Sequence, residues 1–161
     1  MKEILTEFFG NYGNIIVFLH VLSAMIWVGG MIAIRLAVHP NLMRIDDTKL
    51  RLNKLLAITG RFFNIVIPFI TILILTAIIM IMGMKFNETS YLIHLKEAIW
   101  TIMTINFIVM YLKRKKAQKF FDNNQLADAK LTLVAIPKVL LPINIALGII
   151  ALWLGVSLRG F

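Results

Sequence analysis

Cysteine is absent from the 161 residues of this sequence. Its absence excludes disulfide bonds, thiolate metal sites, iron–sulfur clusters and the covalent attachment of haem through a Cys-x-x-Cys-His motif. A metal ion or a metal-containing cofactor would therefore have to be held by histidine, methionine or oxygen ligands.

Charged residues are also scarce. They make up 16% of the chain, whereas about a quarter is usual in a soluble domain. A helix needs about 20 mostly apolar residues to cross the hydrocarbon core of a bilayer. Four runs meet this requirement: Asn14–Ala37, Phe63–Met84, Tyr91–Leu112 and Ile136–Leu158. Because these runs and their connections use up the chain, we predict an all-α fold, a single integral membrane up-down four-helix bundle over residues 1–161.

Acidic residues are few, with 8 aspartates and glutamates against 17 lysines and arginines. All but four of the basic residues lie around the first and third connections between the apolar runs. The exceptions are Lys2, Lys85, Lys96 and Arg159. Since positive residues stay on the cytoplasmic side, this distribution predicts both long loops in the cytoplasm and both termini on the outer side of the membrane, which is the periplasmic side in a bacterial inner membrane. It indicates lipid headgroups, and no nucleic acid, as the partner of the basic loops.

The connections differ in length and character. The first contains an amphipathic run, Lys49–Ile58, which predicts a short helix on the cytoplasmic surface. The second, Lys85–Ser90, is short and predicts a tight hairpin. The third helix is expected to continue through Lys113–Phe121 to a turn at Asp122-Asn123-Asn124.

In each run, many of the polar and small residues recur every three or four positions, so they lie along one face of the helix, called here a stripe. Polar side chains in a membrane span turn toward the bundle interior, because lipid cannot form hydrogen bonds with them. We therefore predict four inward stripes: His20, Ser23, Trp27 and Gly30; Arg61, Asn64, Pro68 and Thr71; His94, Glu97, Thr101 and Thr104; and Leu141, Asn144, Gly148, Ala151 and Gly155. The glycines would let helices approach closely, or would make room for a flat ligand.

Two histidines lie on these stripes, His20 in the first run and His94 in the third. Their depths in the membrane differ by about 5 Å. In an up-down bundle the first and third helices are diagonal, so the two imidazoles would face each other across the core. This arrangement can hold a b-type haem between two axial ligands. The alternative is that both are interfacial histidines, bonded to Ser23, to Glu97 or to the backbone.

Neighbouring residues fit the haem interpretation. Lys96 could reach a haem propionate. Glu97, one turn after His94, could accept a proton from the second ring nitrogen of that histidine. Trp27, two turns along the helix from His20, would offer a flat wall.

Methionines allow a second interpretation. Met80 and Met84 end the second run on the outer side, and thioether sulfur is a good ligand for Cu(I). Together with His20 and His94 they would form an outer-face copper site.

Several segments resemble known families of small bacterial membrane proteins. Leu19-His20, Trp27-Val28-Gly29-Gly30 and His39-Pro40 resemble the first helix of the copper-resistance CopD-like proteins and of the HemJ-type protoporphyrinogen oxidases. His94-Leu95-Lys96 resembles the His-x-Lys motif of the HemJ type, whereas Asn106 and the basic Lys113–Lys116 are more similar to the CopD-like pattern.

The two families imply different activities. The HemJ type is a four-helix haem b protein that oxidises protoporphyrinogen, which would make His20 and His94 haem ligands and Lys96 a functional lysine. The CopD-like group implies the movement of copper into the cytoplasm, with histidine and methionine as ligands.

The sequence therefore predicts a haem b-binding inner-membrane protein that passes electrons from a quinol or a porphyrinogen. An oxidoreductase and an electron carrier both fit this prediction. The alternatives are a copper-binding or copper-transporting membrane protein and a cofactor-free subunit of a larger membrane complex. The outer helix faces would also allow a homodimer.

Overall fold

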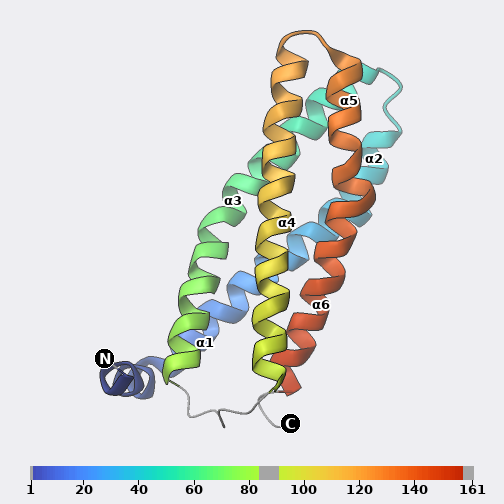
Figure 1. Ribbon diagram of the computed structural model, residues 1–161. Helices are drawn as coiled ribbons and strands as arrows, with labels where there is room; N and C mark the ends of the chain where they lie inside the picture. The colour runs from blue at the N-terminus through green and yellow to red at the C-terminus, as the bar shows by residue number, and fades with distance from the viewer. Residues whose placement is uncertain (1, 84–90, 158–161) are drawn as a thin grey trace.

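The computed structural model describes residues 2–83 and 91–157, and all the regular structure in these ranges is helical (Figure 1). In chain order the elements are α1 (Lys2–Ala33), η1 (Ile34–Val38), α2 (His39–Met43), α3 (Thr48–Gly83), α4 (Tyr91–Asp122), α5 (Leu126–Ala135), η2 (Ile136–Leu140) and α6 (Leu141–Ser157). By length and composition, four segments can cross a membrane: Thr6–Met43, Thr48–Met82, His94–Asp122 and Leu126–Ser157. The predicted all-α fold with four apolar helices is confirmed.

The four membrane-length segments are called rods here: α1–η1–α2, α3, α4 and α5–η2–α6. They run alternately up and down (Figure 1). The start of α1 and the end of α6 lie at the same end of the bundle, called here the terminal end. The connections from α2 to α3 and from α4 to α5 lie at the opposite, loop end. α1 packs against α3 and α6, and α4 packs against α3, α5 and α6. α1 and α4 are therefore diagonal, as expected, whereas the side of the membrane that each end faces stays a prediction.

All four membrane-length segments extend beyond the predicted apolar runs at the loop end. The prediction that Lys49–Ile58 forms a separate surface helix is wrong, because these residues are the first turns of α3. Asp47 caps this helix, since its carboxylate accepts the backbone N–H groups of Lys49 at 2.8 Å and of Leu50 at 3.1 Å. Leu52 and Leu56 are buried in the bundle core, so apolar packing extends α3 past the membrane-spanning length.

The extension of α4 and the turn that follows it are confirmed. α4 continues to Asp122, and Asn124 adopts a positive φ of 58°. The backbone N–H of Gln125 bonds to the carbonyl of Phe120 at 2.9 Å, which satisfies a carbonyl at the helix end. Asparagine tolerates this left-handed conformation better than other side chains do, so the Asp-Asn-Asn sequence gives a tight reversal into α5.

Two rods contain a π-turn, and in both the turn stops at the residue before a proline. The N–H of His39 bonds to the carbonyl of Ile34, and the N–H of Leu141 bonds to the carbonyl of Ile136. The next residues are Pro40 and Pro142. A proline ring collides with the carbonyl four residues earlier, and the wider π-turn relieves that collision. Both rods therefore stay helical through their prolines.

The core lies along one buried stripe of each rod. Trp27 of α1 and Phe107 of α4 meet edge to face at 6.0 Å between ring centroids, and Phe63 of α3 meets Phe107 at 5.2 Å. Met31 and Met110 are fully buried beside them. The diagonal helices thus touch through aromatic side chains in the middle of the bundle.

The predicted inward stripes are right for two rods and wrong for the other two. Ser23 and Trp27 of α1 and Asn144 and Gly148 of α6 are buried as expected. The predicted stripes of α3 and α4 instead include exposed residues: Arg61, Asn64, Pro68 and Thr71 on α3, and His94 and Thr101 on α4. The buried side chains of these helices are Phe63, Val66, Ile70, Leu73 and Thr76 on α3, and Ile99, Met103, Phe107 and Met110 on α4.

The outward threonines explain this error. Thr71 donates to the carbonyl of Ile67 at 3.1 Å, and Thr101 donates to the carbonyl of Glu97 at 2.8 Å. A hydroxyl that bonds to its own helix has no need of an interior partner. Threonines on one face of a membrane helix therefore do not show that this face points inward.

Glycines mark the closest helix approaches. A methyl group added at Gly148 of α6 would lie 2.6 Å from Cγ2 of Val28 on α1. One added at Gly30 of α1 would collide with the ring of Phe62 on α3. At both positions the missing side chain allows two helices to touch. Gly29 differs, because a methyl group there would meet nothing within 4 Å.

We predict that Gly148→Ala lowers the free energy of unfolding by about 1–3 kcal/mol, because the added methyl group separates α1 from α6. Gly29→Ala is the matched control. It adds a methyl group in open space, and it is expected to stabilise the helix by up to about 1 kcal/mol. Thermal unfolding in detergent measures both changes. Equal melting temperatures for the two variants would contradict the close α1–α6 contact.

Candidate functional site

A cavity of about 580 Å³ lies in the half of the bundle nearer the terminal end. Side chains of α1, α3, α4 and α6 line it, and most of them are apolar. Its polar or charged lining residues are His20, Lys96 and Glu97. All three tryptophans of the chain, Trp27, Trp100 and Trp153, also line it. An apolar cavity of this size with a few convergent polar groups is typical of a small-molecule site.

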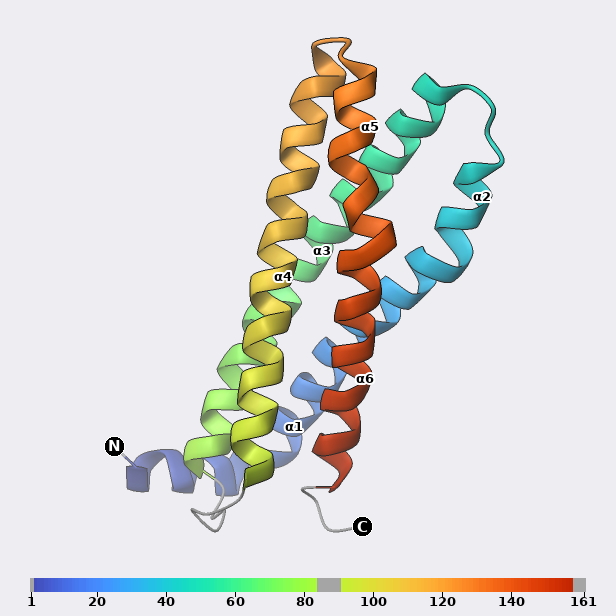
Figure 2. The same ribbon diagram turned by 45° about the vertical axis from the view of Figure 1, so that its right-hand side comes forward.

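The cavity is not fully enclosed, because several side chains that line it are exposed. α1 and α6 touch where Gly148 meets Val28. From there the inclined α1 diverges from α6 toward the terminal end (Figure 2). The exposed side chains that line the cavity include Val21 on α1, Ile81 on α3 and Trp153 on α6, which is 67% exposed. In a membrane these side chains would face lipid.

His20 is held by a threonine of the neighbouring helix. Its Nδ1 lies 3.0 Å from Oγ1 of Thr76 on α3. The Thr76 hydroxyl also lies 2.7 Å from the carbonyl of Ile72 and 3.0 Å from that of Leu73. When its one hydrogen is donated to either carbonyl, its oxygen can accept a hydrogen bond from the Nδ1–H of His20. In that tautomer Nε2 of His20 carries the lone pair with which imidazole binds a metal.

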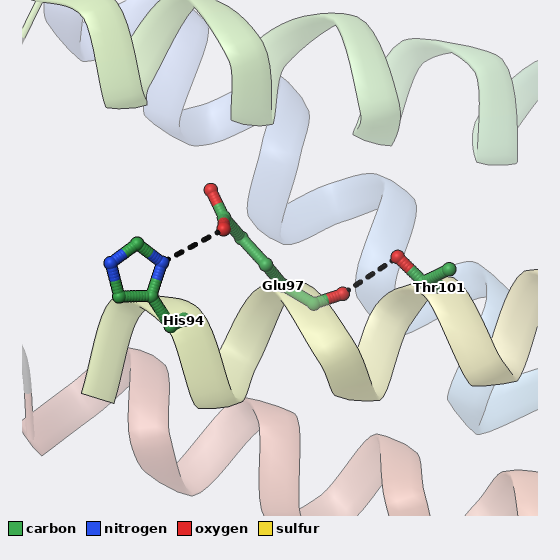
Figure 3. Close-up of polar contacts among 3 residues, drawn as sticks. All are labelled: His94, Glu97 and Thr101. Carbon is green, nitrogen blue, oxygen red and sulfur yellow. Dashed lines mark hydrogen bonds and ion pairs between the residues drawn. The ribbon is translucent and has the colours of Figure 1, made fainter. Parts of the chain in front are cut away.

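His94 and Glu97 form a pair on α4 (Figure 3). Nδ1 of His94 lies 3.3 Å from Oε2 of Glu97, so the predicted contact between the two residues is present. The side chain of His94 is 73% exposed and does not line the cavity, whereas that of Glu97 does. Glu97 thus connects the cavity lining with an exposed imidazole outside it.

Lys96 lies across the gap between α4 and α6. Its Nζ is 3.2 Å from the position that a Cβ on Gly155 of α6 would take. The missing side chain at Gly155 therefore makes room for the ammonium group. An ionisable side chain inside a membrane segment carries a high desolvation cost, and it usually marks a functional site.

Trp27 has a buried donor without an acceptor among the residues that the structure describes. Its side chain is 2% exposed, and its Nε1 has no hydrogen-bond partner there. A buried N–H that lacks its bond costs about 1–3 kcal/mol. The Nε1 atom itself is closed off from the cavity, so the missing bond is a cost of packing this indole in the core.

The predicted haem residues are therefore only partly brought together. His20, Trp27, Lys96 and Glu97 line one cavity, and His94 lies outside its lining. The pairing of His20 with His94 on one iron stays a prediction. Within residues 2–83 and 91–157, no three histidines or carboxylates lie close enough to hold a bare metal ion. Of the predicted copper ligands, Met80 lines the cavity, and Met84 lies outside the described residues.

Thr76 is the site residue that the sequence analysis missed, since it belongs to the buried stripe of α3 and not to the predicted one. A signal for it was present, because Thr76 follows Ile70 and Leu73 at helical spacing on an apolar face. A single polar residue on such a face needs a partner inside the protein.

A separate polar contact joins α4 and α6 nearer the loop end. Asn106 donates to the carbonyl of Leu140 and to Oδ1 of Asn144, both at 2.8 Å. Asn144 is fully buried and donates to the carbonyl of Met103 at 3.2 Å. Both amides are used by the protein itself, so this contact is structural.

Comparisons of this chain with protein-family models, with curated proteins and with solved structures found no match. The geometry described above therefore carries the functional argument alone.

We predict that Asn144→Ala destabilises the protein by about 1–3 kcal/mol, because it leaves the half-buried amide of Asn106 and the carbonyl of Met103 with fewer partners. The exposed Asn64 on α3 provides the control, and Asn64→Ala should change stability by less than about 0.5 kcal/mol. Thermal unfolding of both variants in one detergent tests the difference. An unchanged melting temperature in Asn144→Ala would show that α4 and α6 are held together by apolar packing alone.

Proposed function

We propose that this protein crosses a bacterial inner membrane four times and binds haem b in the cavity between α1, α3, α4 and α6. The observation that carries the proposal is the contact of 3.0 Å between Nδ1 of His20, which lines the cavity, and Oγ1 of Thr76. With Nδ1 as the donor, Nε2 would serve as the ligand. The proposed orientation places the loop end in the cytoplasm, because the basic residues cluster there. Bound haem would supply a one-electron couple for electron transfer.

The cavity fits haem better than it fits a bare ion. Its volume of about 580 Å³ lies within the roughly 300–1,000 Å³ of ordinary ligand sites. Haem brings four nitrogen ligands of its own, so the protein need supply only axial ligands. A bare ion would need a cluster of side chains, which the described residues do not form with histidines and carboxylates.

The residues that would hold haem are His20, Met80 and Lys96. Met80 lies one turn after Thr76 on α3 and lines the same cavity as His20, so we propose that Met80, in preference to His94, would help His20 to hold haem there. Histidine and methionine together are known haem ligands. Lys96 would pair with a propionate near the terminal end.

The absorption spectrum of the protein purified from its native membrane tests this proposal. We expect a Soret band that shifts on reduction with dithionite and disappears in His20→Ala. His94→Ala is the matched control, because its side chain is exposed and outside the cavity. It should keep the band, and Met80→Ala should alter the spectrum of the reduced protein.

Each other outcome has a defined meaning. Loss of the Soret band in His94→Ala would restore the predicted bis-histidine site. A colourless protein that binds Cu(I) stoichiometrically, and loses it in Met80→Ala, would support the copper alternative. A colourless protein that binds neither haem nor copper would overturn the proposal and leave a cofactor-free membrane subunit.

We further predict that Thr76→Val weakens haem binding by about 10–100-fold, because it removes the group that fixes the tautomer of His20. Thr71→Val removes a hydroxyl from the exposed face of the same helix, where it bonds to its own backbone. This control should retain the wild-type affinity. Transfer of haem to an excess of apomyoglobin measures the dissociation rate in all three proteins, and equal rates would show that Thr76 does not support the ligand.

A further inference from the structure

We infer that the first turns of α1, residues 6–13, lie on the surface of the bilayer at the terminal end, with the rings of Phe8 and Tyr12 inserted below the lipid headgroups. The partner of this segment is therefore the lipid interface itself. The inference goes beyond the proposed function and does not depend on haem.

The first support is the length of the first rod. Its membrane-length segment, Thr6–Met43, has 38 residues, which make about 57 Å of helix, whereas the hydrocarbon core is about 30 Å thick. The contact of His20 with Thr76 places these two residues at one level. From Thr76, α3 continues for seven residues to its end at Gly83. The same count back along α1 from His20 reaches Gly13, so the residues before Gly13 lie beyond the end of the neighbouring helix.

The second support is the direction of this segment. In Figure 1, α3, α4 and α6 stand nearly upright, and the first turns of α1 are seen end-on beside the lower end of α3. Figure 2 shows the same turns from the side, running across the lower end of the bundle. The segment thus runs across the rods at the terminal end, as a helix that lies in the plane of a membrane surface does.

The third support is a continuous stripe of exposed apolar side chains. Phe8 and Tyr12 are one turn apart, both are exposed, and their ring centroids are 4.9 Å from each other. Helical spacing continues this stripe to Ile15 and Leu19, which are also exposed and belong to the first apolar run. The aromatic surface of the first turns therefore passes without a break into the surface that the rod presents to lipid.

The polar side chains of the segment lie on a separate stripe. Glu7, Asn11 and Asn14 are exposed, and they lie about 100° around the helix from the aromatic stripe. Apolar rings on one face and polar groups on another are typical of helices at the boundary between hydrocarbon and headgroups. Because this polar stripe carries one carboxylate, two amides and no positive charge, insertion depends on the rings and requires no anionic lipid.

The absence of cysteine makes the test direct. The single-cysteine variants Phe8→Cys and Tyr12→Cys, and the matched controls Glu7→Cys and Asn11→Cys, carry a nitroxide label in phosphatidylcholine vesicles. Power-saturation EPR measures how often each label collides with oxygen, which concentrates in hydrocarbon, and with a neutral nickel chelate, which stays in water. We expect the ratio of oxygen to nickel collisions to be about three- to tenfold higher on the aromatic stripe than on the polar one, as for an apolar face about 5–10 Å deep.

Two further labels provide reference values. Phe18→Cys replaces an exposed side chain in the first apolar run, and Asn123→Cys replaces one in the turn at the loop end. Equal ratios on the two stripes, or ratios at Phe8→Cys and Tyr12→Cys as low as that of Asn123→Cys, would overturn the inference. Dipolar broadening of these two labels that disappears on dilution with unlabelled protein would also overturn it, since a second copy would then cover the rings. A missing Soret band would refute only the haem proposal.

Discussion

The contact between Gly148 of α6 and Val28 of α1 determines how the rest of the structure is arranged. At this point the two helices approach so closely that even a methyl group would not fit. On the loop side of it, the bundle is filled by aromatic and aliphatic side chains such as Phe63 and Phe107. On the terminal side, α1 inclines away from α6 and the cavity opens. One absent side chain thus separates a packed half from a hollow half.

The number of rods and their order could be predicted from the sequence, because a helix that spans a bilayer requires a long apolar run, and few other structures require one. The inward faces of α3 and α4 could not. In a membrane segment nearly every position is apolar, so the face must be inferred from the few polar residues. Thr71 and Thr101 are misleading for this purpose, because each bonds to its own backbone and can face outward.

The candidate site was likewise predicted in part: some of its residues were named from the sequence and others were missed. His20, Trp27, Lys96 and Glu97 were predicted from spacing, and they line one cavity because α1 and α4 face each other diagonally. The partner of His20 was not predicted, since Thr76 lies on the buried stripe of a helix whose orientation was wrong. His94 lies outside the cavity lining because the predicted inward face of its own helix, α4, was also wrong. An error in one helical face therefore affects the residues of a site more than it affects the fold.

Each π-turn changes which residues face the core in the helix that follows it. η1 separates α1 from α2, and η2 separates α5 from α6. In the last rod the buried positions step from Leu133 to Ile136, then by five residues to Leu141, and then again by three to Asn144. The five-residue step coincides with η2. One additional residue rotates everything beyond it by about 100° around the axis. A single rod thereby presents one face to the core at the loop end and, after the proline, a newly aligned face around the cavity.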